Sequence, residues 1–199
     1  MTPLRLYIAG THSTGKTTLA RRIEMELRAT GITVARTGGF AKRAAELGLP
    51  KMTRHTAQST TWIINATSNA ALEAELTADV VIVDRTPYDA LAYYLAAVQH
   101  RDEHPDPEAL SRLTALAQLA CPHPPAFLAT LLDPALPLAE HPGKDPDWTD
   151  TGFREAVDQQ LHQALAAYAV PHIPVPSHGH ATAVDAAVKT ITAAWEAAA

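Results

Sequence analysis

The sequence predicts an α/β fold, in which a mostly parallel five-stranded sheet has helices on both faces and a lid segment. Short apolar runs alternate along the chain with longer amphipathic stretches, which is typical of strand–helix–strand units with right-handed crossovers. Several runs are continuous rather than alternating, as in strands that are covered on both faces. The 199 residues, 47% hydrophobic and 19% charged, suit one domain over residues 1–199 that buries a large core.

Five apolar runs are the predicted strands. They span residues 4–9, 33–36, 80–83, 127–132 and 170–175. In the last run, Pro171 and Pro174 cannot donate hydrogen bonds to a neighbouring strand, which restricts this run to a sheet edge or an irregular strand.

Six helices are predicted between and after these strands. They span residues 16–30, 55–77, 87–100, 106–120, 153–168 and 181–197. In the first of them, Leu19, Ile23 and Leu27 recur every four residues, and Gly31 ends the helix. Pro87 stands in the first turn of the third helix, where its missing N–H is harmless.

Residues 134–152 follow neither period and are rich in proline and glycine. A loop of this length within a compact domain is usually either functional or disordered. We expect this segment to be a lid over the functional site, and a solvated connector is the alternative.

A phosphate-binding loop is predicted between the first strand and the first helix. The residues fit the pattern G-x-x-x-x-G-K-[ST], and the motif lies where it must, after a strand and before an amphipathic helix. The glycines let the backbone turn and present N–H groups to phosphate oxygens, at a helix N-terminus whose dipole favours anions. The lysine would contact the β- and γ-phosphates of ATP, and Thr17 would be a magnesium ligand. The predicted nucleotide-binding residues here are Gly10, Thr11, His12, Ser13, Thr14, Gly15, Lys16, Thr17 and Thr18.

An acidic residue and an arginine end the third predicted strand. Asp84 and Arg85 follow a buried apolar run, and the carboxyl ends of parallel strands face the crevice where ligands bind. Asp84 could hold Mg²⁺ or accept a proton from a substrate hydroxyl, and Arg85 could clamp a phosphate with two hydrogen bonds. The alternative is that Asp84 caps the next helix and Arg85 pairs with it.

The stretch 81–94, VIVDRTPYDALAYY, resembles the strand-and-helix signature of small P-loop kinases and related ATPases. It is similar to the group around the nicotinamide riboside kinase domain and its small AAA-like ATP-binding relatives. The Asp-Arg pair also resembles that of thymidylate kinase and the deoxynucleoside kinases. The similarity runs over most of the chain and is weak outside residues 8–18 and 79–94. It implies a P-loop NTPase fold, ATP and Mg²⁺ as cofactors, and phosphoryl transfer to a small molecule, but it does not name the acceptor.

The predicted acceptor side begins after the second strand. Similar kinases carry an acidic residue followed by an arginine there; Arg43 would match the arginine, but Thr37 or Gly38 stands in place of the acid. A solvated helix arginine is the alternative for Arg43. Gln58, with Thr61, Asn65 and Asn69, falls on one face of the long second helix beside Trp62. Gln58 and Trp62 could line a pocket for a base or sugar, or the face could be an ordinary polar surface.

Further candidates lie near the two ends of the site. Tyr88 and Asp89 follow the acidic pair and are candidates for contact with substrate, although Asp89 could instead stabilise the first helical turn. Lys144 in the predicted lid and Arg154 on the following helix could reach the transferring phosphate, or could be surface charges. The resemblance favours Arg154, and it also places His178, in the turn after the last strand, beside the adenine.

The composition argues against a nucleic-acid partner and a membrane span. The net charge is −5 and no basic run is present, so a nucleic-acid partner is not expected. The longest apolar stretches are too short for a membrane span, and the single cysteine, Cys121, fits a reducing compartment. We expect a cytoplasmic protein; the oligomeric state stays open, with a homodimer as one option.

These patterns favour an ATP- and Mg²⁺-dependent kinase that acts on a nucleoside, a nucleotide or a related hydroxyl compound. Lys16 would hold the phosphates, Asp84 would orient or deprotonate the acceptor hydroxyl, and Arg85 and Arg154 would stabilise the negative charge. A nucleotide-hydrolysing regulatory ATPase or switch is the alternative. A kinase of an antibiotic or other specialised metabolite also stays open.

Overall fold

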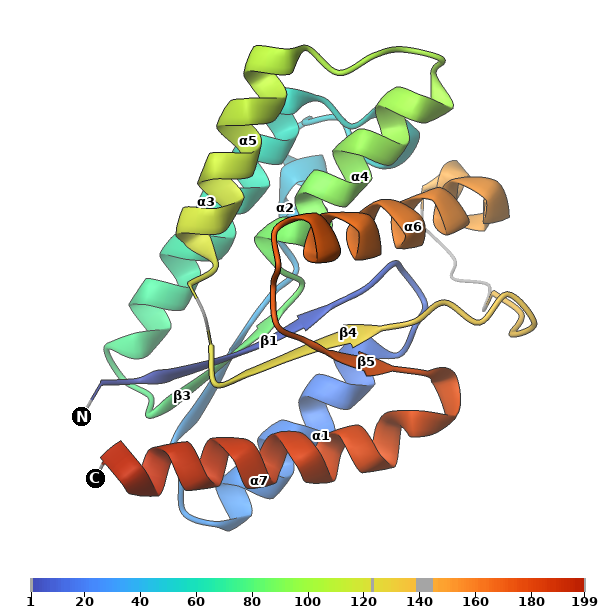
Figure 1. Cartoon of the computed structure of the whole chain (residues 1–199). Helices are drawn as coiled ribbons and strands as arrows, with labels where there is room; N and C mark the ends of the chain where they lie inside the picture. Colours follow the sequence, from blue (N-terminus) through green and yellow to red (C-terminus); the bar gives the residue numbers. More distant parts are fainter. Residues whose placement is uncertain (1, 123, 139–144, 199) are drawn as a thin grey trace.

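The computed structural model describes residues 2–122, 124–138 and 145–198. It shows one parallel sheet of five strands in the order β2-β3-β1-β4-β5 (Figure 1). This arrangement confirms the α/β fold predicted from the sequence. The strands are β1 (Leu4–Ala9), β2 (Val34–Thr37), β3 (Val80–Asp84), β4 (Ala126–Thr130) and β5 (Ile173–Val175).

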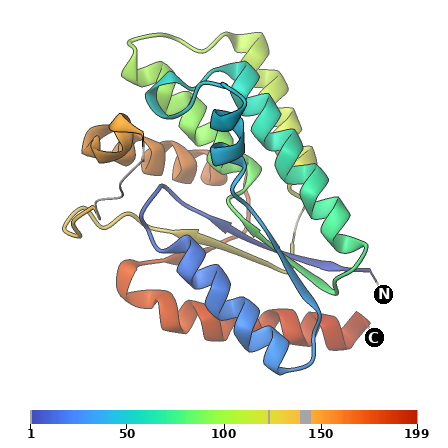
Figure 2. The same ribbon diagram turned by 180° about the vertical axis from the view of Figure 1, so that it is seen from behind.

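Helices cover both faces of this sheet (Figures 1 and 2). The helices α1 and α7 lie together on one face, and α3, α4, α5 and α6 lie on the other. The helix bounds are α1 (Lys16–Ala29), α2 (Phe40–Glu46), α3 (Ala57–Glu75), α4 (Pro87–His100), α5 (Pro107–Ala120), α6 (Thr151–Ala167) and α7 (His180–Ala198). Among the residues that the structure describes, no helix is long and apolar enough to cross a membrane.

The central strand divides the core between the two faces. Leu6 and Ile8 of β1 pack into the cluster with α1 and α7, whereas Tyr7 and Ala9 pack into the cluster below α3 to α6. All four side chains are at most 1% exposed. Successive residues of a strand point to opposite faces, so a continuous apolar run is what a strand buried on both faces requires.

The register brings three strand ends together. Ile8 of β1 pairs with Asp84 of β3, and Ala9 pairs with Ala129 of β4. The chain segments that follow β1, β3 and β4 therefore meet at one edge of the sheet. This edge carries the glycine-rich loop, Asp84 and Thr130, and it is where ligands bind in open parallel sheets.

The element bounds differ from the predicted ones at a few places. Strand β4 ends at Thr130 rather than at residue 132, because the Leu132 N–H turns away to donate to Asp158 Oδ1 at 3.2 Å. Strand β5 begins only at Ile173, after the first of its two prolines. Helix α2 was not predicted, since its seven residues after Gly39 span only two turns. Three short 3₁₀ helices were also not predicted: η1 (Met52–Arg54), η2 (Pro146–Thr149) and η3 (Ser177–Gly179).

Candidate nucleotide site

The glycine-rich loop leaves β1 at Gly10 and enters α1 at Lys16. Gly10 has φ 147° and Gly15 has φ 81°, and both values lie in the region that favours glycine. A Cβ on Gly10 would stand only 1.8 Å from Thr130 Oγ1 on β4. Close packing against the neighbouring strand end, and not the turn alone, therefore demands glycine at position 10.

Replacing Gly10 by alanine is expected to destabilise the fold by about 3 kcal/mol or more, because steric overlap adds to backbone strain. Gly31→Ala is the matched control: Gly31 has φ 87° but no atom within 4 Å of an added Cβ. It is expected to lose only about 1 kcal/mol. Urea unfolding of both variants measures the difference, and equal losses would show that the contact with Thr130 is unimportant.

The loop offers free backbone donors to a ligand. Its first N–H groups are used by helix α4, since Gly10 donates to Asp89 Oδ1 at 3.0 Å and His12 donates to the Tyr93 hydroxyl at 3.1 Å. Within the described parts of the chain, the N–H groups of residues 13–15 have no acceptor. Unpaired N–H groups at a helix N-terminus are the donors that phosphate oxygens accept from.

Lys16 is buried inside this loop, with only 4% of its surface exposed. Its ammonium donates to the Thr11 carbonyl and, at 3.3 Å, to Thr14 Oγ1. Burial, with a further contribution from the Arg85 charge, lowers the pKa of Lys16 to about 7. A buried cation in this setting gains most from an anion that replaces its lost hydration.

Thr17 and Asp84 meet at the end of β3. The Thr17 hydroxyl donates to Asp84 Oδ2 at 2.8 Å, and Arg36 Nη1 lies 3.9 Å from the same oxygen. The other carboxylate oxygen, Oδ1, accepts no hydrogen bond from the described residues. A hydroxyl and a carboxylate beside a phosphate loop form the oxygen donor set that Mg²⁺ prefers. The chemistry of these two residues would suit a magnesium ion.

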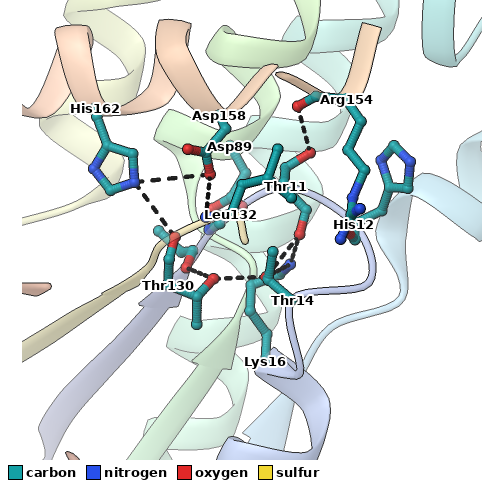
Figure 3. A network of polar contacts seen from close by, with 12 residues as sticks. Thr11, His12, Thr14, Lys16, Asp89, Thr130, Leu132, Arg154, Asp158 and His162 are labelled. Carbon is teal, nitrogen blue, oxygen red and sulfur yellow. Dashed lines mark hydrogen bonds and ion pairs between the residues drawn. The ribbon is translucent and has the colours of Figure 1, made fainter. Parts of the chain in front are cut away.

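Two arginines converge on the loop. Arg154 of α6 donates from Nε to the His12 carbonyl at 3.1 Å and from Nη2 to the Ser13 carbonyl at 3.2 Å. The Thr11 hydroxyl donates back to the Arg154 carbonyl at 3.2 Å (Figure 3). The Arg85 guanidinium lies over the Tyr93 ring, 5.7 Å from its centroid, and forms no ion pair within the described segments. Lys16, Arg85 and Arg154 thus concentrate positive charge around the loop.

The structure corrects two predicted substrate contacts. Asp89 is only 3% exposed; it accepts from the Thr86 N–H at 2.7 Å and the Thr86 hydroxyl at 2.8 Å, and it also binds the Gly10 N–H. It therefore caps α4 and supports the loop, and it does not face an acceptor. Tyr88 is 3% exposed and stacks on Tyr168 at 6.3 Å in the core, so its predicted contact with substrate is wrong.

The remaining acceptor candidates are not gathered at the loop. Gln58 is exposed on α3, Trp62 packs against the core, and Arg43 is exposed and pairs with Glu46 at 3.2 Å, as a solvated helix arginine does. Lys144 lies outside the described residues, as does part of the predicted lid, and His178 lies in η3. Its neighbour His180 is the histidine at the loop, because a Cβ on Gly15 would stand 2.4 Å from His180 Cε1.

Sequence reasoning missed a polar network around the end of β4 (Figure 3). Thr130 Oγ1 lies 2.7 Å from Thr14 Oγ1 and donates to the Ala9 carbonyl at 3.1 Å. His162 Nε2 lies 3.3 Å from the Thr130 carbonyl and 3.9 Å from Asp158. No motif marks these residues, and because the strand was predicted to end at residue 132, the sequence did not place Thr130 at the edge of the sheet where ligands bind.

His12 also has a role that the motif did not predict. Its ring is fully buried, with Nδ1 3.0 Å from the Tyr93 hydroxyl, Nε2 3.1 Å from the Trp148 carbonyl, and its centroid 4.5 Å from that of Trp148. Burial, with repulsion from Arg85 next, lowers the pKa of His12 to about 3. The ring is therefore neutral at physiological pH and joins the loop to η2.

Comparisons with known proteins support the P-loop fold. No curated protein matches the chain in sequence. A crystal structure of NadR protein in complex with NAD and AMP-PNP is similar in fold, with 16% identity and a TM-score of 0.68. Another, of NadR protein in complex with NR, has 17% identity and a TM-score of 0.66. In each case 96% of this chain is covered, but the chain spans only half of the NadR chain. The model of a family described as AAA domain matches residues 5–182, and the chain thus belongs to this family and has a P-loop NTPase fold.

Proposed function

We propose that the protein is an ATP- and Mg²⁺-dependent phosphotransferase that acts on a small molecule with a free hydroxyl group. The observation that carries this proposal is the position of Asp84, whose Oδ2 accepts from Thr17 in the phosphate loop while its Oδ1 stays open. The Asp84 carboxylate would thus contact the magnesium through Oδ2, beside Thr17, and leave Oδ1 for the acceptor hydroxyl. Phosphoryl transfer depends on such positioning more than on covalent chemistry by the protein.

The donor would bind in the loop. The N–H groups of residues 13–15 and the Lys16 ammonium would hold the β- and γ-phosphates, and Arg85 would face the spreading charge of the transferred group. Magnesium held near Thr17 and Asp84 would neutralise charge on the same phosphates. The likeness to NadR structures, one of which contains the ATP analogue AMP-PNP, agrees with a nucleotide donor.

The acceptor would enter between the ends of β2 and β3. Thr37 Oγ1, at the end of β2, is buried and has no hydrogen-bond partner within the described segments. Gly38 follows, and a Cβ there would stand 2.9 Å from the Asp84 carbonyl. An unpaired buried hydroxyl is costly unless a ligand satisfies it. Asp84 Oδ1 would then orient the acceptor hydroxyl or accept its proton.

Residues 134–152 would act as the lid in this proposal. The described part of this segment borders a cavity of about 260 Å³ that Leu132, Leu136 and Arg154 help to line. Arg154 also donates hydrogen bonds to the loop carbonyls, so movement of the segment would shift Arg154 and with it the loop that binds the phosphates. Lid closure of this kind excludes water and completes the site.

Incubation with ATP, Mg²⁺ and a panel of nucleosides, nucleotides and aminoglycoside-type hydroxyl compounds tests the function. The expected result is a phosphorylated product that forms in step with ADP release for one acceptor class. ADP release that is slow and equal with every acceptor would overturn the kinase and favour the nucleotide-hydrolysing ATPase. Absence of ATP binding in calorimetry would overturn both.

A further inference from the structure

Helix α4 holds the phosphate loop through two residues four positions apart. Asp89 accepts from the Gly10 N–H at 3.0 Å, and the Tyr93 hydroxyl accepts from the His12 N–H at 3.1 Å. Residues at i and i+4 lie on one face of a helix, so one helix face takes alternate N–H groups of the loop. The N–H groups of residues 13–15 are thereby left for a ligand.

The hydrogen-bond partners of His12 determine its tautomer. The Tyr93 oxygen accepts from the His12 N–H, so its own proton is free to be donated to Nδ1 at 3.0 Å. The Trp148 carbonyl, 3.1 Å from Nε2, can only accept, so the neutral ring carries its proton on Nε2 and Nδ1 is the acceptor. Every polar atom of the buried ring is satisfied in this one arrangement.

The ring of Tyr93 also contacts Arg85. The Arg85 guanidinium lies over it, 5.7 Å from the centroid, and the edge contact with Phe153, at 6.0 Å between centroids, fixes the ring from another side. Arg85 has φ 82°, an unusual value for a residue with a side chain, and its N–H is held by the Ile8 carbonyl at 3.0 Å. Arg85 forms no ion pair within the described segments. The Tyr93 side chain contacts its charge directly, and the nearby carboxylates of Asp89 and Asp84 stabilise that charge further.

We propose that Tyr93 is a positioning residue of the transfer site, whose hydroxyl fixes the phosphate loop and whose ring fixes Arg85. The inference rests on the proposed function only in so far as Arg85 stabilises a transferred phosphate. The two halves of the side chain have separable effects. The hydroxyl sets the geometry in which a triphosphate binds, and the ring sets the charge that the transition state meets.

The variants Tyr93→Phe and Tyr93→Leu separate the two effects. Tyr93→Phe, which loses only the hydroxyl, is expected to bind AMP-PNP with Mg²⁺ about fivefold to tenfold more weakly. Its kcat for ADP release is expected to change by less than about threefold. Tyr93→Leu, which loses the ring as well, is expected to have a kcat about tenfold or more below the kcat of Tyr93→Phe. Tyr94→Phe is the control, since Tyr94 is a buried neighbour on the same helix that makes no hydrogen bond to the loop.

The hydrogen bond at His12 Nδ1 provides a readout that simple loss of stability would not change. ¹⁵N NMR of the histidine rings is expected to show the Nε2–H form of His12 in the unmodified protein, in Tyr94→Phe and in Tyr93→Phe, because the Trp148 carbonyl is kept. A displaced Nδ1 shift is expected in Tyr93→Phe alone, where Nδ1 has lost its donor. Unaltered His12 shifts and unaltered AMP-PNP affinity in Tyr93→Phe would overturn the role of the hydroxyl. Equal kcat in Tyr93→Phe and Tyr93→Leu would overturn the role of the ring. Binding of AMP-PNP and the slow release of ADP by hydrolysis are both measured without an acceptor, so the result for Tyr93 does not depend on the result of the acceptor panel.

Discussion

The variant Lys16→Ala is expected to bind ATP about 100-fold more weakly and to lose almost all turnover. Lys16 is the cation at the centre of the loop, and hydrogen bonds to charged groups contribute about 1.5–3 kcal/mol each. Its contacts with Thr11 and Thr14 hold the ammonium inside the loop, close to the N–H groups that would bind the phosphates. Calorimetric titration with ATP and Mg²⁺, together with an ADP-release assay, measures both effects.

The pH dependence of binding tests the same residue independently. The pKa of Lys16 is lowered to about 7 by burial, and phosphate oxygens beside the ammonium would raise it again. Above pH 7 the free protein therefore lacks a proton that the complex holds, so binding takes up a proton and affinity falls as the pH rises. Titrations at about pH 8 in two buffers of different ionisation enthalpy give the number of protons taken up.

A surface lysine serves as the control for both measurements. The side chain of Lys42 is 86% exposed and lies on α2, and Lys42→Ala is expected to bind and turn over ATP as the unmodified protein does. Proton uptake should persist in Lys42→Ala and vanish in Lys16→Ala. Undiminished ADP release by Lys16→Ala would mean that the loop does not act on the triphosphate.

The sequence predicted those parts of the site that depend on local order along the chain. The run of residues 4–9 is apolar on both faces, and β1 is buried on both faces; the glycine pattern after it forms the loop. Asp84 could be placed because it ends an apolar strand, and carboxyl ends of parallel strands share one edge. These conclusions need only periodicity and handedness of the connections.

The sequence could not show which side chains meet across elements. Asp89 and Tyr93 stand four residues apart on a predicted helix, but only the packing of α4 against the sheet end shows that both face the loop. Tyr88, one residue earlier, points into the core instead. A helix turns about 100° per residue, so a small error in its rotation exchanges a site residue for a core residue.

Of the two positions where an acid was expected after the second strand, position 38 excludes one for a steric reason. A Cβ at position 38 would stand 2.9 Å from the Asp84 carbonyl and 3.3 Å from the Asp84 Cβ. No side chain fits there while Asp84 keeps its place, so an acid at this point would displace the carboxylate on which the site depends. The acceptor would therefore meet Thr37 and Asp84, rather than two carboxylates.

The variant Asp84→Asn is expected to bind ATP nearly as well as the unmodified protein but to transfer phosphate about 100- to 1,000-fold more slowly. Asparagine has the same shape, and its carbonyl oxygen can still accept from the Thr17 hydroxyl, so the fold and the loop should be kept. The lost negative charge weakens the magnesium ligand and removes the group that would accept a proton. Titration of turnover against Mg²⁺ separates these two causes. If saturating Mg²⁺ restores turnover, the defect comes from weaker metal binding. If the defect persists at saturating Mg²⁺, it comes from the lost interaction with the acceptor hydroxyl.

The exposed residue Asp185 on α7 provides the charge-matched control. Asp185→Asn changes the net charge equally and is expected to leave turnover unchanged, which excludes a general electrostatic effect. If Asp84→Asn turned over as fast as Asp185→Asn at every Mg²⁺ concentration, the pairing of Thr17 with Asp84 would be only structural. The open oxygen Oδ1 would then have no part in transfer, and the water-consuming ATPase would be the better description, because it needs no group to orient an acceptor hydroxyl.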